Sequence, residues 1–247
     1  MDNELRRFMN GTSLRTLSII IPAYNEGRTI TEQLDQVLAV RLLAGVQREM
    51  VIVDDGSKDD TAARAQAFQA AHPSERIRVF VQPVNRGKGA AIHKGIELAE
   101  GDHLIVQDAD LELDPAQIND LLGPVLAGEA DVVYGNRFAD GLPYPEYPVR
   151  SYRANRFLTW LSNRFTGLDL GDMEVCYKLI PVPIAKKLVL REQRFGFEPE
   201  VTSRLARVQG LRWKQVPVRY SARTHGEGKK IGWKDGIRAV WCILRYR

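Results

Sequence analysis

Two pairs of acidic residues are the most chemically specific feature of this sequence of 247 residues. Asp108 and Asp110 stand one residue apart, directly after the apolar run 103–106. In proteins, Mg²⁺ is typically held by one or two carboxylates together with substrate phosphates. An ion bound here would neutralise a departing diphosphate. An isolated Asp-x-Asp is more often a solvated turn or a helix cap, so its surroundings must decide between the two interpretations.

The second pair, Asp54 and Asp55, follows the apolar run 50–53 and precedes a Gly-Ser dipeptide. Taken alone it predicts a β-turn in which an Asp side chain caps the next helix. Adjacent carboxylates at a strand end also accept hydrogen bonds from nucleotide bases and ribose hydroxyls. Lys88, in the Gly-rich basic stretch 85–89, either meets a phosphate or belongs to a plain turn, and both interpretations stay open. The stretch lacks the Gly-Lys-Ser/Thr ending of a P-loop.

The elements that must position these residues can be predicted from the hydrophobic pattern. Amphipathic segments such as 30–38 and 118–125 have helical spacing, and Asp114 with Pro115 forms a helix-start signal before the second. Short apolar runs between them have the length of buried strands: residues 17–21, 50–53, 77–81, 103–106 and 131–134. The alternation predicts an α/β fold with a Rossmann-like, mostly parallel sheet flanked by helices. Ligands gather at the carboxyl ends of such strands. A polar cluster follows each of the five runs, at residues 22–26, 54–57, 85–89, 108–110 and 135–137, so we expect one shared site.

The second half of the chain has a different pattern. The Pro-rich stretch 143–148 predicts a flexible connection or lid. Residues 154–165 and 200–208 have helical patterns, and residues 213–220 predict a strand that Pro217 favours at a sheet edge. We expect this half to form the acceptor side of the site.

Composition excludes several classes of protein. With 44% hydrophobic and 27% charged residues the chain is neither disordered nor fibrous. Its two cysteines, Cys176 and Cys242, provide no disulfide framework, and the first residues lack the apolar core of a secretory signal. No apolar run is long enough to span a bilayer. We therefore expect a cytoplasmic protein whose membrane contact is peripheral, on the inner face; the net charge of +4 is too modest to indicate a nucleic-acid partner.

The order of the motifs resembles the inverting family 2 glycosyltransferases, which have the GT-A fold. Within that family it is most similar to the dolichyl- or polyprenyl-phosphate glucosyl- and mannosyltransferase branch. The resemblance covers roughly residues 17–240. The motifs that carry it are IIIPAYNE (19–26), VDDGS (53–57), NRGKG (85–89), DAD (108–110), GNRF (135–138), DMEVCYK (172–178) and FGFEPE (195–200).

The resemblance implies a donor pocket and a metal site. The implied nucleotide-binding residues are Pro22, Ala23, Tyr24, Glu26, Asp54, Asp55, Lys88, Asp108 and Ala109. The implied ligands of Mg²⁺ or Mn²⁺ are Asp108, Asp110 and Glu112. Family members often carry Gln at the position of Glu112.

The resemblance also implies catalytic residues: Asp110, Arg137, Asp172 and Glu174. Arg137 matches an arginine that steadies phosphate. In many inverting relatives a carboxylate near Asp172 or Glu174 is the general base that takes a proton from an acceptor hydroxyl. A phosphate acceptor is already anionic and needs no base, so these carboxylates would then position the donor, the acceptor or an arginine. A simple helix cap is the remaining alternative.

Acceptor or phosphate contacts are implied for Ser151, Arg153, Arg223, His225, Lys229 and Lys230. Residues 223–230 form a basic, Gly-containing stretch that is expected to close over the diphosphate and exclude water. For Arg153 and His225 an ordinary solvated position is an equally good interpretation.

We expect three parts: an N-terminal extension (1–16), a GT-A glycosyltransferase domain (17–230) and a C-terminal amphipathic helix (231–247). The apolar residues of the last part have helical spacing, opposite Lys234, Arg238 and Arg245: Trp233, Ile237, Val240, Trp241 and Leu244. Such a helix either lies in the plane of a membrane surface or packs on the protein's own core.

The resemblance implies a metal-dependent inverting transfer of a hexose from a nucleotide diphosphate sugar to a polyprenyl phosphate at a membrane surface, in cell-envelope glycan synthesis. UDP-glucose is the implied donor. Three alternatives stay open: transfer to a hydroxyl of a glycan or glycolipid, a sugar nucleotidyltransferase, and a nucleotide-sugar-binding regulator without catalysis.

Overall fold

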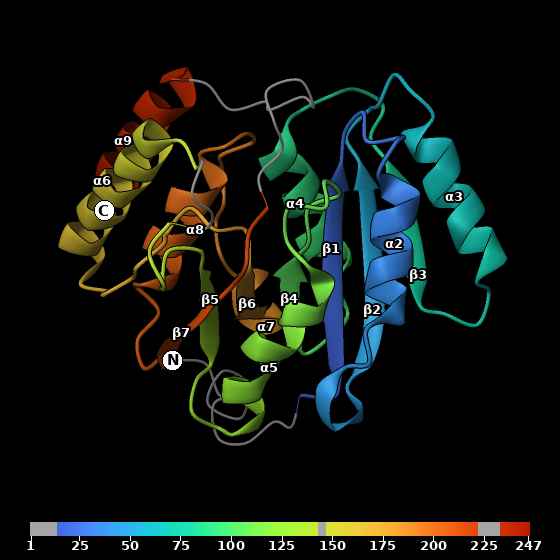
Figure 1. Ribbon diagram of the computed structural model, residues 1–247, viewed down its shortest axis with the longest axis horizontal. Coiled ribbons are helices and arrows are strands. Elements are labelled where there is room, and N and C mark those ends of the chain that lie inside the picture. The colour runs from blue at the N-terminus through green and yellow to red at the C-terminus, as the bar shows by residue number, and fades with distance from the viewer. Residues whose placement is uncertain (1–13, 143–146, 222–232) are drawn as a thin grey trace.

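A twisted sheet forms the centre of the molecule (Figure 1). The computed structural model describes residues 14–142, 147–221 and 233–247. Within them seven strands pair in the order β3-β2-β1-β4-β6-β5-β7. The strands are β1 (Thr16–Ala23), β2 (Gln47–Asp54), β3 (Ile77–Val81), β4 (His103–Val106), β5 (Val132–Asn136), β6 (Lys178–Pro181) and β7 (Trp213–Pro217).

The sheet is mostly parallel, as predicted. β1 pairs in parallel with β2 and β4, β2 with β3, and β5 with β7. The exception is β6, which runs antiparallel between β4 and β5. All five strands predicted in the first half are present, and β7 is an edge strand, as Pro217 indicated. The pattern did not predict β6.

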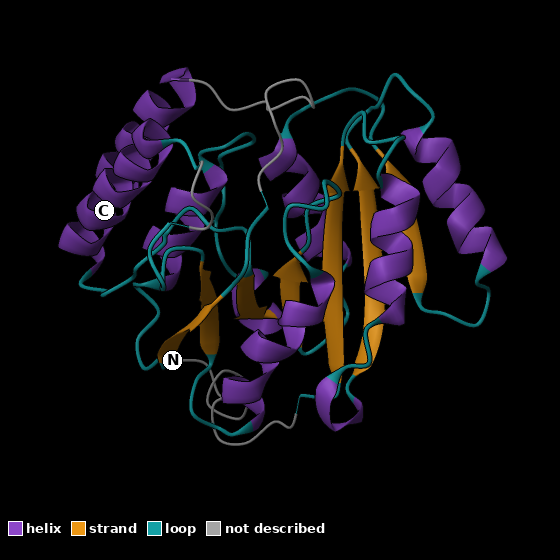
Figure 2. Cartoon of the chain, viewed as in Figure 1, coloured by secondary structure: helices purple, strands orange, loops and turns teal. Residues whose placement is uncertain are grey.

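Helices cover both faces of the sheet (Figure 2). They are α2 (Ile30–Ala39), α3 (Thr61–Ala71), α4 (Lys88–Leu98), α5 (Ile118–Leu126), α6 (Val149–Thr166), α7 (Val182–Ala185), α8 (Phe197–Leu205) and α9 (Trp233–Tyr246), with short 3-10 turns η1 (Leu43–Gly45) and η2 (Pro115–Gln117). The predicted start signal is present at η2, where the Asp114 side chain accepts a hydrogen bond from the Ala116 amide at 2.9 Å.

Alternate residues of β1 build two separate cores. Ile19 and Ile21 pack with Leu34 of α2 and other residues on one face. Ile20 packs on the other face, in a cluster that includes residues of α4 and α8. This two-sided burial explains why the strand is apolar throughout and not alternating. A third cluster joins β5, α6 and α9 through Tyr134, Leu158 and Ile243.

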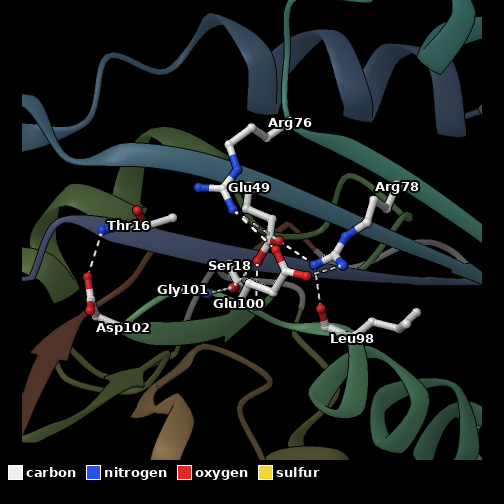
Figure 3. A network of polar contacts seen from close by, with 9 residues as sticks. All are labelled: Thr16, Ser18, Glu49, Arg76, Arg78, Leu98, Glu100, Gly101 and Asp102. Atoms are coloured by element: carbon white, nitrogen blue, oxygen red, sulfur yellow. Dashed lines mark hydrogen bonds and ion pairs between the residues drawn. The ribbon is translucent and has the colours of Figure 1, made fainter.

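A polar network ties the amino ends of β1 and β2 to the segment before β4 (Figure 3). The buried Glu49 carboxylate accepts hydrogen bonds from Ser18, Arg78 and, at 2.9 Å, the Glu100 amide. Burial alone would raise the pKa of Glu49, but these hydrogen bonds and the Arg78 charge hold it below its ordinary value. Asp102 accepts from the Thr16 amide at 2.9 Å in the same network. These acids serve the fold, because their oxygens are taken up by protein donors.

In the part of the chain that the structure describes, no helix combines the length and the apolar composition needed to cross a membrane.

Candidate functional site

A cavity of about 410 Å³ opens where β1, β2, β4 and β5 end. The strand register explains the convergence, because Ala23 of β1 pairs with Asp54 of β2, and Ile20 with Val106 of β4. Twelve of the residues singled out in the sequence line the cavity: Pro22, Ala23, Tyr24, Glu26, Asp55, Lys88, Asp108, Ala109, Asp110, Glu112, Arg137 and Glu174.

Hydrogen bonds fix the wall formed by the loops after β1 and β2. Asn25 has a left-handed backbone (φ 54°), and its side-chain oxygen accepts from the Lys58 amide at 2.8 Å. Glu26 donates its amide to Thr61 Oγ1 at 2.8 Å. Thr29 donates to the carbonyl of Ala109 at 2.8 Å, which ties this wall to the loop after β4. Strained backbone of this kind concentrates at functional sites.

The two acids after β2 have different environments. Asp54 does not line the cavity: it is buried, and its Oδ2 accepts from the Ser57 amide at 3.0 Å, as in the turn that its sequence also allowed. Asp55 reaches the cavity, but its carboxylate already accepts from Gln82, Asn85 and the amides of residues 86 and 87, at 2.7–2.8 Å. Asp55 therefore shapes the loop before Lys88.

The acidic pair after β4 faces a cation of the protein itself. Lys88 Nζ lies 2.7 Å from Asp108 Oδ2. Burial opposes the charged form of Lys88, but the Asp108 carboxylate raises the pKa of Lys88 above its ordinary value. Burial, together with the charges of Asp108 and Glu112, raises the pKa of Asp110 to about 7. Leu111, between Asp110 and Glu112, has a left-handed backbone (φ 62°), a strained conformation for a branched residue.

The carboxylates fit a divalent cation that also binds phosphate. Two aspartates crowd together at the cavity wall, and a cation would relieve the repulsion that raises the pKa of Asp110. Glu112 accepts a hydrogen bond from Tyr220 at 2.7 Å. Among the described residues no group of three metal-binding side chains is close enough to hold an ion. An ion here would take oxygens from Asp108 and Asp110 and complete its shell with donor phosphates.

Arg137 is the most firmly held cation of the site. Its Nε and Nη2 donate to the two oxygens of Asp172 at 2.6 and 2.9 Å, and its guanidinium lies 5.1 Å from the ring centroid of Tyr220. Burial opposes the charge, but Asp172 raises the pKa of Arg137 further above its ordinary value. The side-chain amide of Asn155 is best oriented with its oxygen toward Arg137. In that orientation the oxygen accepts a hydrogen bond from Arg137 Nη2 at 2.8 Å. Asp172 is fully buried and does not line the cavity, so it orients Arg137.

Glu174 differs from its neighbour Asp172. It lines the cavity, and its Oε1 has no hydrogen-bond partner among the described residues. Burial and the nearby Glu198 charge raise the pKa of Glu174 to about 7, although Lys178 and Arg137 act in the opposite direction. Glu198 itself forms a buried ion pair with Lys178. Glu174, like Asp110, therefore gains and loses its proton near neutral pH, where an ordinary carboxyl group is already ionised.

The remaining predicted acceptor residues lie away from this cavity or outside the description. Ser151 and Arg153 are in the first turns of α6, and neither lines it; Arg153 is exposed. Arg223, His225, Lys229 and Lys230 lie outside the described residues.

Some lining residues were not singled out in the sequence. Arg194, just before the FGFEPE motif, lines the cavity, and so does Tyr220, the last residue of the predicted strand 213–220. Arg137 and Tyr220 also line a second cavity of about 750 Å³. The motif beside Arg194 was a usable signal, whereas nothing local distinguished Tyr220 from a strand residue.

Comparisons with known proteins show the family to which the chain belongs. The sequence profile of "Glycosyl transferase family 2" matches residues 18–188. The undecaprenyl-phosphate 4-deoxy-4-formamido-L-arabinose transferase of Shewanella sediminis is 29% identical, over 92% of this chain and 65% of the relative. The dolichyl-phosphate beta-glucosyltransferase of Drosophila melanogaster is 30% identical, over 93% and 75%. This chain thus spans about two thirds to three quarters of the length of these relatives.

Solved structures share the fold. The glucosyl-3-phosphoglycerate synthase of Mycobacterium tuberculosis, in complex with Mn²⁺, UDP and its glucosylated product, superposes with a TM-score of 0.70 at 23% identity. The match covers 99% of this chain and 83% of that one. The predicted resemblance and the predicted GT-A architecture are therefore confirmed. The chain belongs to glycosyl transferase family 2.

Proposed function

We propose that this protein transfers a hexose from a nucleotide diphosphate sugar to a polyprenyl phosphate, with inversion and with the help of Mg²⁺ or Mn²⁺. The observation that carries the proposal is the convergence of Asp108, Asp110, Lys88 and Arg137 on one cavity from different strand ends. This arrangement supplies carboxylates for an ion and cations for phosphates, which a diphosphate leaving group needs.

UDP-glucose is the proposed donor. The Mycobacterium tuberculosis neighbour has been solved with Mn²⁺ and UDP-glucose, and the Drosophila melanogaster relative is a glucosyltransferase by name. Tyr24 and Glu26 line the same cavity as Asp108 and Asp110, which gives the base and ribose a wall next to the phosphates.

The leaving group is stabilised at one end of the cavity. An ion held by Asp108 and Asp110 would supply positive charge to the departing diphosphate. Lys88 already stands at Asp108 and can exchange part of that contact for a phosphate oxygen. Arg137 is held by Asp172 through Nε and Nη2, and Nη1 has no hydrogen-bond partner among the described residues. We assign this free nitrogen to a phosphate, because the charge of Arg137 persists at any physiological pH.

A phosphate acceptor fits the state of the two candidate bases. Asp172 is committed to Arg137 and cannot accept a substrate proton without releasing it. Glu174 is partly protonated near neutral pH, since burial raises its pKa to about 7. An anionic phosphate attacks the anomeric carbon without a base, and the relatives from Shewanella sediminis and Drosophila melanogaster are named for prenyl-phosphate acceptors. A lipid acceptor in turn would place the protein at the inner face of a membrane, as a peripheral protein of cell-envelope glycan synthesis.

One specific observation favours a second candidate, transfer to a hydroxyl of a glycan or glycolipid. Glu174 faces the cavity with one oxygen unpartnered among the described residues, which is the geometry expected of a general base. This candidate differs from the first in its dependence on Glu174 and not in its donor site.

The Asp110→Ala variant tests the donor and metal part of the proposal. We expect transfer from radiolabelled UDP-glucose to undecaprenyl phosphate, with Mg²⁺ or Mn²⁺ present, to fall at least about 100-fold, because charge stabilisation at the leaving group is lost. Asp35→Ala, an exposed helix position, is the matched control and should retain full activity.

Both variants and the wild type should unfold cooperatively in a thermal melt. Near-normal turnover of Asp110→Ala would refute the metal site. Binding of UDP-glucose without transfer or hydrolysis, in the presence of either ion and with both phosphate and hydroxyl acceptors, would favour a regulator instead.

A further inference from the structure

Exposed aromatic side chains gather on two helices of the described part of the chain. Among the described residues, every exposed Phe, Trp or Tyr lies on α6 or α9: Phe157 (51% exposed), Trp160 (60%), Phe165 (37%) and Trp241 (43%). On α6, Phe157 and Trp160 are three residues apart and their rings are neighbours, with centroids 5.9 Å apart. On α9, Ile237, Trp241 and Leu244 are exposed at helical spacing. Large exposed apolar patches on soluble domains mark interaction sites.

The same two helices carry the positive charge of the chain. α6 contains four arginines and no acidic residue, and α9 with Arg247 contains four basic residues and one acid. Together they contribute a net charge of +7, whereas the whole chain has a net charge of +4, so the rest of the protein has a net charge of −3. Arg153, Arg156 and Arg164 are exposed beside the aromatic residues of α6.

The two helices pack on each other and form one surface. Leu158 of α6 and Ile243 of α9 belong to the same buried cluster. At the exposed side, the Arg247 guanidinium lies 5.4 Å from the ring centroid of Phe165, which joins the end of one helix to the end of the other. Figure 1 shows α6 and α9 together at the end of the molecule opposite α3. We name this surface the α6–α9 face; its residues are Arg153, Arg156, Phe157, Trp160, Arg164, Phe165, Ile237, Trp241, Leu244 and Arg247.

The α6–α9 face is connected to the catalytic cavity through its buried side. Asn155 of α6 contacts Arg137, and the ring of Tyr152 lies 5.2 Å from that of Phe138, the residue after Arg137. α9 is anchored by Arg238, which donates to Glu192 at 2.7 and 3.0 Å, two residues before Arg194 of the cavity wall. A partner surface that binds the exposed side of α6 is therefore separated from Arg137 only by this helix.

We propose that the α6–α9 face docks in the plane of an anionic lipid bilayer, with α6 contributing as much as α9. Aromatic rings and aliphatic side chains would enter the boundary between headgroups and acyl chains, while the arginines meet lipid phosphates. A second copy of the chain fits this surface poorly, since it would bring two helix pairs of net charge +7 against each other. Docking would bring Arg137 close to a lipid-linked phosphate, and this part of the inference rests on the proposed function. The apolar and basic character of the surface does not depend on the proposed function.

Vesicle binding by the full chain tests the proposal. Wild-type protein should co-float with vesicles of phosphatidylglycerol and phosphatidylethanolamine, and much less with pure phosphatidylcholine. The triple variant Phe157→Gln, Trp160→Gln, Trp241→Gln should lower the partition coefficient at least ten-fold. The matched control, Val84→Gln with Val189→Gln, changes two residues that are exposed to 62% and 61% away from this face, and it should bind like the wild type.

Two further arms separate the alternatives. The α6 charge reversal Arg156→Glu, Arg164→Glu should abolish the preference for anionic vesicles, and equal binding by this variant would overturn the electrostatic part. Light scattering without vesicles should show the same molar mass for the wild type and the aromatic triple variant. If the wild type is a dimer, the triple variant is a monomer and vesicle binding is unchanged, the face binds a second copy of the chain and the membrane assignment is overturned.

A soluble short-chain prenyl phosphate distinguishes this proposal from the proposed function. The aromatic triple variant should glycosylate it at the wild-type rate, while losing activity on acceptor embedded in vesicles. If the wild type transfers sugar to no prenyl phosphate at all but still binds anionic vesicles through this face, the proposed function fails and the docking surface stands. If the triple variant binds vesicles as tightly as the wild type, the docking surface fails, whatever the activity.

Discussion

At the scale of single residues, the acids of this protein separate into those that the fold has already satisfied and those that it has left for chemistry. Asp55 and Asp172 accept several short hydrogen bonds each, whereas burial raises the pKa of both Asp110 and Glu174 to about 7. The sequence could predict that these residue types meet in one place, because strand ends converge in a parallel sheet. It could not separate Asp172 from Glu174, since the arginine that occupies Asp172 is 35 positions away.

Glu174→Gln separates the two acceptor classes at the residue scale. Gln keeps the shape of the side chain but cannot take up a proton. With undecaprenyl phosphate as acceptor we expect kcat to change less than about ten-fold, because a phosphate acceptor needs no base. With a hydroxyl acceptor the loss should be about 100-fold or more. The wild-type rate should then rise as pH increases through 7, as Glu174 becomes a carboxylate.

Initial rates over a pH series, for both acceptors, measure the difference. Asp172→Asn is the companion variant: it should reduce activity with either acceptor, because Arg137 loses its anionic partner. A large loss for Glu174→Gln on the phosphate acceptor would contradict the proposed function and show that the carboxylate itself contacts a substrate.

At the scale of elements, a strand can be predicted from the sequence when the interactions that stabilise it are evident from its own residues. β1, β2, β4 and β5 contain apolar runs buried on both faces, and such runs can be recognised without knowing their partners. β3, at the edge of the sheet, is only partly buried. β6 has only four residues and begins with Lys178, a residue type rarely found buried. Its ammonium is satisfied by Glu198, twenty positions along the chain, and by a carbonyl of residue 175. A strand that depends on such a partner cannot be predicted from its own residues.

Helix α4, which carries Lys88, offers a test of close packing against helix propensity. Gly89 lies in the first turn of α4, and a Cβ there would come within 2.3 Å of the Glu192 carbonyl oxygen. Gly236 lies in α9, and outside its own helix and chain neighbours no atom lies within 4 Å of such a Cβ. Alanine is favoured over glycine in a helix by about 1 kcal/mol. We therefore expect Gly236→Ala to raise the melting temperature by about 2–4 °C.

Gly89→Ala should instead lower stability by about 1–3 kcal/mol, because backbone must shift to admit the methyl group. It should also raise KM for the nucleotide sugar, since the displaced segment includes Arg194 and the start of α4. Calorimetry and donor titration measure both effects. Equal stabilisation of the two variants would mean that the 191–194 segment yields freely and does not define the donor cavity.

At the scale of the whole molecule, two buried groups at opposite ends of the sheet change the pH dependence of stability in opposite directions. His103 is buried near the amino ends of the strands, and burial lowers the pKa of His103 to about 4. Glu174 lies at the cavity, and burial raises its pKa to about 7. Neither effect is visible in the sequence, because each depends on depth within the fold and not on residue type. The acid near the site is destabilising in its charged form, which is a common feature of functional groups.

Two neutral substitutions should therefore change the pH dependence of stability in opposite directions. Unfolded His103 takes up a proton below about 6.5 while the folded form does not until about 4, so wild-type stability relative to His103→Gln should fall by about 3 kcal/mol as pH drops over that interval. Glu174 loses its proton near 4.5 when unfolded but only near 7 when folded, so wild-type stability relative to Glu174→Gln should fall by up to about 3 kcal/mol as pH rises between those values. Urea unfolding of the three proteins from pH 4 to 8 measures both differences. The two slopes oppose each other, and Asp110, whose pKa is also raised to about 7, adds a slope of the same sign as Glu174, so only the variants reveal the separate contributions. Parallel profiles for His103→Gln and the wild type would show that the histidine is hydrated or charged in the folded protein.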